Sequence, residues 1–239
     1  MRALVVLPTY NEILNVDSML RALRNVVPSC DVLVVDDASP DGTADCAQRL
    51  GEELGRVHVL RRPGKSGLGG AYRAGFAWGL ERDYDHFVEI DCDFSHDPKA
   101  LPTLLSVAES FDVVIGSRYI KGGVIPQWAL SRRVLSRGGN QYASLLLGLG
   151  VADSTSGYRV YSRSALAKID YRTVTADGYG FQIEMTYRAR SGGASITEVP
   201  ISFSDRELGE SKMSGAIVIE ALWLVTKWAI ERPFGRGAH

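Results

Sequence analysis

Residues 86–93 read His86-Phe87-Val88-Glu89-Ile90-Asp91-Cys92-Asp93. The first five residues are a short, mostly apolar run, which predicts a buried β-strand, and two aspartates follow it directly. In an open α/β sheet, ligands bind at the carboxyl ends of the strands. Carboxylates one residue apart on a turn suit Mg²⁺ or Mn²⁺, whose other ligands are phosphate oxygens of a substrate. The stretch predicts a metal-bound diphosphate at Asp91 and Asp93, with a solvated acidic turn as the alternative.

The first half of the chain repeats this strand pattern. Strands are expected at residues 3–7, 31–35, 57–61, 86–90 and 112–116. Amphipathic helices are expected between them, near residues 16–25, 43–54, 70–80 and 100–108. Each intervening segment is long enough for a crossover connection, so the pattern predicts a mostly parallel α/β sheet with helices on its faces.

The second half is less regular. It predicts a loop at 117–131, a helix at 132–149 interrupted by Gly138-Gly139, a short helix at 181–189, a strand at 195–201, a polar loop at 208–215 and an apolar helix at 216–230. The last helix is expected to pack against the body, although its Trp223 and Trp228 also suit a membrane interface. The length of 239 residues fits a single domain over residues 1–239.

The charge and cysteine content limit the classes of ligand and the cellular compartment that the protein suits. The net charge of −1 does not favour a nucleic-acid binder. No acidic residue occurs between Asp112 and Asp153, and this interval holds five basic residues: Arg118, Lys121, Arg132, Arg133 and Arg137. A local basic surface predicts an anionic ligand or membrane surface, with a solvated basic face as the alternative. The odd number of cysteines, three, indicates free thiols in a reducing compartment.

The glycine-rich stretch Gly64-Lys65-Ser66-Gly67-Leu68-Gly69-Gly70 is not a P-loop, because Val59 stands where that motif requires glycine. It still offers backbone amides, a lysine and a helix N-terminus to an anion, and a flexible loop explains it equally well. The ends of the first two expected strands carry polar groups for a nucleoside. Asp37 is expected to bind a base or sugar, whereas Asp41 is expected to build the turn and cap the next helix.

Together these motifs resemble glycosyltransferase family 2, of the GT-A fold. The generic motifs are Pro8-Thr9-Tyr10-Asn11-Glu12, Val35-Asp36-Asp37-x-Ser39-x-Asp41-Gly42-Thr43, Lys65-x-Gly67-Leu68-Gly69, Asp91-x-Asp93 and His96-x-Pro98. The second half resembles dolichol-phosphate mannosyltransferases more specifically. Its motifs are Gly116-Ser117-Arg118-Tyr119, residues 131–138, residues 155–161, Gly178-Tyr179-x-Phe181-Gln182-x-Glu184-Met185 and residues 198–212.

The resemblance implies residue roles. Nucleotide-sugar binding is implied for Pro8, Tyr10, Glu12, Val35, Asp37, Asp91, Cys92, Asp93, Arg118, Arg206 and Lys212. Asp91 and Asp93 match the metal position, with Asp93 the principal ligand. Arg132 and Ser136 match positions near an acceptor phosphate, and Asp93, Arg118 and Arg132 are the residues expected to be catalytic. Ser95 stands where many relatives have a glutamine as a further metal contact.

The implied reaction is inverting transfer of mannose from GDP-mannose to a polyprenyl phosphate, with Mg²⁺ or Mn²⁺ as cofactor. Residues 1–116 would bind the nucleotide sugar and residues 117–239 the acceptor. The expected location is the cytoplasmic face of a membrane, held peripherally, with a membrane-anchored protein partner left open. The alternatives are a family 2 transferase using another nucleotide sugar or a carbohydrate acceptor, and a non-catalytic nucleotide-sugar-binding module.

Overall fold

The computed structural model describes residues 1–205 and 215–231. Its strands are β1 (Ala3–Thr9), β2 (Asp31–Asp36), β3 (Val57–Arg61), β4 (His86–Glu89), β5 (Val113–Ser117), β6 (Arg159–Ser162) and β7 (Ile196–Pro200). Its α-helices are α1 (Val16–Val26), α2 (Thr43–Leu54), α3 (Gly67–Leu80), α4 (Leu101–Ala108), α5 (Leu130–Leu147), α6 (Arg163–Ile169), α7 (Gly178–Ser191) and α8 (Gly215–Glu231). Two 3₁₀ turns, Pro98–Ala100 and Tyr171–Thr173, complete the described elements.

The strands form one seven-stranded sheet in the order β3-β2-β1-β4-β6-β5-β7. The pairings β1–β2, β2–β3, β1–β4 and β5–β7 are parallel, whereas β6 runs antiparallel to both β4 and β5. The predicted mostly parallel α/β sheet is therefore confirmed. The sheet passes without a break from the first half of the chain to the second.

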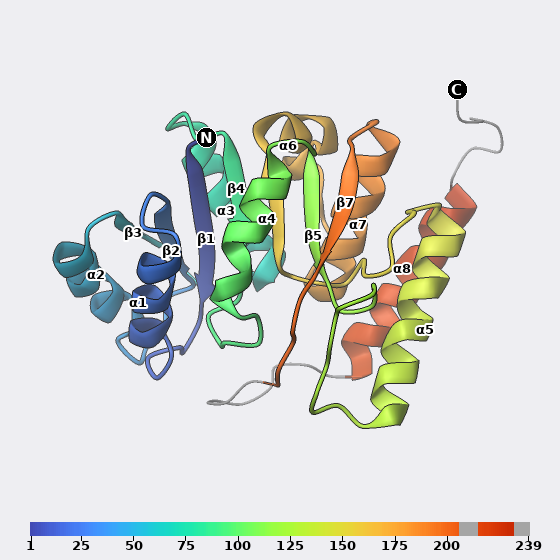
Figure 1. Ribbon diagram of the computed structural model, residues 1–239, viewed down its shortest axis with the longest axis horizontal. Helices are drawn as coiled ribbons and strands as arrows, with labels where there is room; N and C mark the ends of the chain where they lie inside the picture. Colours follow the sequence, from blue (N-terminus) through green and yellow to red (C-terminus); the bar gives the residue numbers. More distant parts are fainter. Residues whose placement is uncertain (206–214, 232–239) are drawn as a thin grey trace.

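Helices cover both faces of the sheet (Figure 1). Alternation along β1 sends Leu4 and Val6 to one face, with α3, α6 and α7, and Val5 and Leu7 to the other, with α1, α2 and α4. Burying one such aliphatic side chain contributes about 1.5–3 kcal/mol. The helices α5 and α8 pack on each other beside this body.

Helix α3 approaches the sheet closely because its glycines leave room. A Cβ on Gly79 would lie 2.6 Å from side-chain atoms of both Leu4 and Phe87. The same helix buries Tyr72 completely, and its hydroxyl lies near Asp91. The close packing of α3 therefore places Tyr72 beside Asp91, directly after the carboxyl end of β4.

The second half differs from the sequence-based expectation in two elements, one missed and one wrongly predicted. Strand β6 was not predicted, because Arg159 and Ser162 give it a polar appearance, yet Arg159 is fully buried by polar partners. Helix α5 is not interrupted at Gly138-Gly139, since it runs continuously from Leu130 to Leu147. An added Cβ at either glycine would meet nothing within 4 Å, so this pair lies on an open helix surface.

Candidate active site

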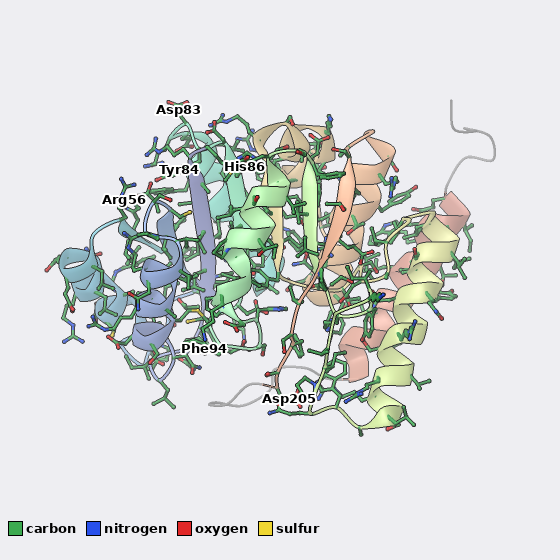
Figure 2. All side chains as sticks on the ribbon, in the orientation of Figure 1. Arg56, Asp83, Tyr84, His86, Phe94 and Asp205 are labelled. Carbon is green, nitrogen blue, oxygen red and sulfur yellow. The ribbon has the colours of Figure 1, made fainter. Side chains whose placement is uncertain are left out.

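The predicted site residues of the first half gather at one edge of the sheet. This is the carboxyl end of the parallel strands β1, β2 and β4, where open α/β sheets bind ligands. Figure 2 shows Phe94, which follows Asp93, at this edge, with Asp205 nearby and with Arg56, Asp83 and His86 at the opposite edge. Non-glycine residues in the left-handed region follow all three strands: Asn11, Ala38 and Phe94. Such backbone is held by its surroundings and often marks a functional edge.

Asp91 and Asp93 have different surroundings. Oδ1 of Asp93 accepts a hydrogen bond of 3.0 Å from the backbone N–H of Ser95, so the Ser95 backbone contacts this carboxylate. The Tyr72 hydroxyl donates to Oδ1 of Asp91 at 3.4 Å. Burial, reinforced by Asp91, raises the pKa of Tyr72 well above its ordinary value, so the hydroxyl stays protonated and remains a donor. Cys92, between them, packs in the apolar cluster under the sheet.

The donor set at this edge fits a hard divalent cation. Asp91 and Asp93 offer carboxylate oxygens, the ligand type that Mg²⁺ and Mn²⁺ prefer. No group of three or more His, Cys, Asp or Glu side chains suited to a metal occurs within residues 1–205 and 215–231. A cation held by these aspartates would therefore take further ligands from water and from a bound substrate, as Mg²⁺ does in nucleotide sites.

The predicted nucleoside residues line the ends of β1 and β2. Val35 is completely buried in the core, so only its backbone is available to a ligand. Glu12 is buried and accepts a 2.9 Å hydrogen bond from Asn15 Nδ2 at the start of α1. Pro8 and Tyr10 are half-buried, and the Lys65 ammonium lies 4.5 Å from the centre of the Tyr10 ring. Tyr10 and Lys65 thus lie together, although 55 residues separate them in the sequence.

Asp37 is held by a basic partner that sequence reasoning missed. Arg62 Nη1 lies 2.6 Å from Asp37 Oδ1, and the backbone N–H of Ser66 donates to Oδ2 at 3.2 Å. Arg62 also contacts the Ser66 hydroxyl. Asp37 therefore fixes the glycine-rich loop beside the nucleoside residues. Asp41 accepts hydrogen bonds from the backbone and hydroxyl of Thr43, the turn-building contacts expected of it.

The helix N-terminus in the glycine-rich stretch already has an anionic partner. Oδ1 of Asp177 accepts a 2.8 Å hydrogen bond from the backbone N–H of Gly69 in the first turn of α3. Gly67 has a φ of +77°, and a Cβ there would overlap Oδ2 of Asp177. Asp177 is the N-cap residue that directly precedes α7, so its carboxylate joins the glycine-rich loop to a helix of the second half.

Arg118 is buried, not exposed on a basic surface. Its Nε and Nη2 each donate to Asp153 at 2.7 Å, and Nη2 also donates to the Thr155 hydroxyl at 2.8 Å. Burial disfavours the Arg118 charge, but the Asp153 carboxylate outweighs burial and raises the guanidinium pKa. Arg118 thus keeps its charge inside the protein. The prediction that Arg118 belongs to a basic surface is wrong, because Asp153, the acidic residue that ends the acid-free stretch, pairs with it inside the protein.

The segment 153–158, here called the bridging loop, lies between Arg118 and the aspartates. Asp153 and Thr155 contact Arg118, while a Cβ on Gly157 would lie 3.6 Å from Oδ2 of Asp91. Burial, assisted by Arg118, lowers the pKa of His96 to about 4, although Asp93 and Asp153 oppose this change. The charges of Arg118 and Asp93 therefore both affect the pKa of His96, so the two residues lie within electrostatic reach of one neutral imidazole.

A buried polar network lies beneath Asp91. Gln182 Nε2 donates to Glu89 Oε2 at 2.8 Å, and Arg159 donates to the backbone oxygens of Ser154 and Ser156 at 2.7 Å. Burial raises the pKa of Glu89 to about 8, although Arg159 and Gln182 oppose the rise. Oε1 of Glu89 and Oε1 of Gln182 have no hydrogen-bond partner in the part of the chain that the structure describes. Sequence reasoning assigned no role to Glu89 or Arg159.

The predicted acceptor residues lie on the first turns of α5. Arg132 Nη1 lies 3.0 Å from Asp205 Oδ1, and its guanidinium stacks 3.8 Å from the Trp128 ring centre. Trp128 Nε1 donates to the same Asp205 oxygen at 2.8 Å. The Tyr119 hydroxyl donates to Ser136 Oγ at 2.6 Å. Arg206 and Lys212, the other predicted phosphate-binding residues, lie outside the described residues, as does most of the polar loop at 208–215.

The helices α5 and α8 carry exposed apolar side chains. Leu145 is 82% exposed and Trp223 60% exposed, while Ala221 and Val225 bury the other side of α8 against the body and Trp228 packs there. Arg133 and Arg137 are exposed on α5, and Lys121 is exposed in the loop that follows β5. None of the helices described has the length and hydropathy that a membrane crossing requires.

Solved structures share this architecture. A Pyrobaculum calidifontis mannosyltransferase, PcManGT, solved with GDP-Man and Mn²⁺, aligns with a TM-score of 0.65 at 16% identity, covering 99% of this chain and 66% of that one. S. aureus TarS in complex with UDP-GlcNAc aligns with a TM-score of 0.64 at 17% identity, covering 99% and 68%. The chain therefore has the GT-A glycosyltransferase fold that the motifs predicted.

The chain belongs to glycosyl transferase family 2, whose family model matches residues 4–170. It is 53% identical over 230 residues to a Micrococcus luteus protein named undecaprenyl-phosphate mannosyltransferase, covering 96% of this chain and 95% of the relative. It is 48% identical over 231 residues to the polyprenol monophosphomannose synthase of Mycolicibacterium smegmatis, covering 96% and 87%. These relatives confirm the predicted resemblance.

Proposed function

We propose that this protein transfers mannose from GDP-mannose to a polyprenyl phosphate, giving polyprenyl phosphomannose and GDP. The observation that carries the proposal is the bridging loop, which contacts Arg118 at one end and approaches Asp91 at the other. The guanidinium of buried Arg118 and the proposed diphosphate site at Asp91 would therefore both lie beside this one short segment. The names of the two relatives support a polyprenyl phosphate as acceptor. The GDP-Man in the PcManGT structure is in keeping with GDP-mannose as donor.

On the donor side, the protein's side chains would bind the nucleotide sugar and orient it for transfer. Tyr10, Lys65 and Asp37 surround the proposed nucleoside site, and Asp91 and Asp93 would hold Mg²⁺ or Mn²⁺. Such a cation, when bound, stabilises negative charge on the departing diphosphate. Neutral His96 and buried Tyr72 add no negative charge beside these carboxylates.

On the acceptor side, the chemistry requires placement more than proton removal. A phosphate monoester, with a second pKa of about 6, is already anionic at neutral pH. The principal task is to hold two anionic groups together against their repulsion. Arg118, Arg132 and Ser136 are proposed for this task, with Arg206 and Lys212 carried over from the family resemblance. A single displacement would invert the anomeric carbon and give a β-linked mannosyl phosphate.

The proposal treats residues 1–239 as a single domain, with residues 1–116 for the donor and 117–239 for the acceptor. The continuous seven-stranded sheet supports one domain. We further propose that the protein works peripherally on the cytoplasmic face of a membrane. Helices α5 and α8 expose apolar residues, α5 also exposes Arg133 and Arg137, and Lys121 is exposed in the loop before α5, a combination that suits anionic headgroups.

The test is a product assay with purified protein. GDP-mannose, GDP-glucose and UDP-glucose are each supplied with polyprenyl phosphate, with a simple sugar acceptor, or with neither. Mannosyl lipid formed only from GDP-mannose and polyprenyl phosphate is expected, and NMR of its anomeric centre should show the β-linkage. Transfer to the sugar in place of the lipid would overturn the proposal in favour of a carbohydrate-directed transferase.

A matched pair of variants tests the metal site. Asp93→Asn should lose most transfer at every Mg²⁺ or Mn²⁺ concentration, because the carboxylate would supply several kcal/mol through the cation. Asp97→Asn is the control, since Asp97 follows four residues later and its side chain caps the 3₁₀ turn at Pro98. Equal activity of the two variants would remove Asp93 from the metal site.

A further inference from the structure

We propose that Asn140 is a positioning residue that fixes the acceptor end of α5 against the bridging loop. Asn140 is 1% exposed and uses its full hydrogen-bonding capacity. Nδ2 donates to the Ser136 carbonyl at 3.0 Å and to Thr155 Oγ1 at 3.1 Å. Oδ1 accepts from Ser154 Oγ at 3.0 Å and from the Thr155 backbone N–H at 3.2 Å.

These contacts close a ring around the proposed acceptor site. Thr155 Oγ1 receives hydrogen bonds from both Asn140 and Arg118. On the other side, Asn140 contacts the carbonyl of Ser136, whose hydroxyl accepts from Tyr119, the residue after Arg118. Within this ring, Asn140 joins helix α5 directly to the bridging loop.

The first part of α5 depends on this attachment because apolar burial does not hold it. No side chain from Leu130 to Gly139 is buried, and Asn140 is the first buried residue of the helix. Leu130, Val134 and Leu135 are each more than 60% exposed. Polar contacts must therefore set where Arg132 and Ser136 lie relative to Arg118. A satisfied buried network specifies one arrangement, which is the role that the geometry assigns to Asn140.

The inference rests on the proposed function insofar as Arg132 and Ser136 bind the acceptor phosphate. The primary variant is Asn140→Leu, which keeps a similar volume and removes all four hydrogen bonds. Thr155→Val removes the hydroxyl that accepts from both Asn140 and Arg118 and that donates to Asp153, and it retains the backbone N–H that donates to Asn140. It decides the same question should Asn140→Leu not fold, since the exchange of residues 130–139 reports on the attachment of α5 alone. Gln141→Leu is the matched control, because Gln141 is the exposed neighbour on the same helix.

Kinetics per folded molecule give the first readout. Asn140→Leu should lower kcat/KM for the acceptor by about 10- to 100-fold, since a displacement of about 1 Å at a reacting group has effects of that size. The affinity for GDP, measured by titration calorimetry, should stay unchanged, and Gln141→Leu should match the wild type. A residue that only stabilises the fold would lower the melting temperature and leave the acceptor KM unchanged, and that result would overturn the inference.

Hydrogen exchange gives a readout independent of activity. Amides of residues 130–139 should exchange faster in Asn140→Leu, while those of β1 and β4 keep the wild-type rate. Unchanged exchange in residues 130–139 would overturn the inference. Wild-type protein that transfers nothing to polyprenyl phosphate would instead refute the proposed function, and the exchange result would still decide whether Asn140 fixes α5.

Discussion

The Arg118–Asp153 pair allows a quantitative prediction. Both side chains are almost completely buried, at 3% and 0% exposure, and their closest N–O distance is 2.7 Å. With charge centres about 4 Å apart and an effective dielectric of about 20, the attraction is about 4 kcal/mol. Removing one partner leaves a buried charge uncompensated, which costs about 3–5 kcal/mol in comparable pairs. Asp153→Asn should therefore lower the free energy of unfolding by about 4 kcal/mol.

The assay is denaturant unfolding of five proteins at pH 7.5: wild type, Asp153→Asn, Asp153→Leu, Arg118→Met, and the double variant Arg118→Met/Asp153→Leu. Each single variant leaves a charged or polar partner buried alone, whereas the double variant removes both charges. The double variant should therefore recover most of the loss, since apolar replacements of buried pairs are often neutral. The coupling energy of the cycle formed by the wild type, Arg118→Met, Asp153→Leu and their double variant isolates the pair.

An exposed pair in the same region is the control. Arg132 and Asp205 are 47% and 41% exposed, so Asp205→Asn should cost less than about 1 kcal/mol. The reasoning is refuted if Asp153→Asn costs no more than this control, or if the two single losses add up in the double variant. Either outcome would mean that water reaches Arg118 and that the bridging loop does not hold it.

Three further predictions concern other parts of the molecule. Burial raises the pKa of Glu89 from 4.5 to about 8, so the folded state holds an extra proton between these values and stability falls as the pH rises through them. Denaturant titrations of Glu89→Gln should lack this fall, a difference of about 2 kcal/mol between pH 6 and pH 8, and parallel profiles for variant and wild type would contradict it. Gly67→Ala should weaken GDP binding in calorimetry, because φ is +77° and Asp177 fills the space of a Cβ, whereas Gly64→Ala meets nothing within 4 Å and should bind normally. Leu145→Glu should reduce sedimentation with anionic vesicles. The control is Leu14→Glu, which should not, because Leu14 is 66% exposed but lies outside α5 and α8. Equal loss in both variants would argue against α5 as the membrane-contacting helix.

The sequence predicts the sheet and its ligand-binding edge well because both depend on local patterns. Apolar runs predicted the bounds of β1 to β5 and β7 to within two residues, and the motif Asp91-Cys92-Asp93 lies at the carboxyl end of β4 as expected. The antiparallel β6 was missed because Arg159 resembles a surface residue. Its burial depends on oxygens of Ser154, Ser156 and Gln182, which no local pattern reveals.

Site residues whose partners are distant in sequence could not be found. Arg62 pairs with Asp37 across 25 residues, and Arg118 pairs with Asp153 across 35. Asn140 resembles an ordinary polar residue following two glycines, and its role depends on a loop 15 residues away. The available signals were weak: an isolated acid at the end of an acid-free stretch, and an asparagine on the buried side of an otherwise amphipathic helix.

The two sides of the proposed site differ in what holds them, and the difference suits their ligands. Asp91 and Asp93 follow a buried strand, with the completely buried Tyr72 and Gln182, which is 2% exposed, beside them, so the donor side is fixed by the core. The acceptor side depends on the first turns of α5, where no side chain is buried and polar contacts carry the attachment. A nucleotide sugar arrives from water and needs one rigid geometry. A polyprenyl phosphate arrives with its tail in a bilayer, so the helix that receives it must present apolar residues outward and cannot also bury them in the core. Polar anchoring through Asn140 meets both demands, since it fixes Arg132 and Ser136 without using the apolar face of the helix.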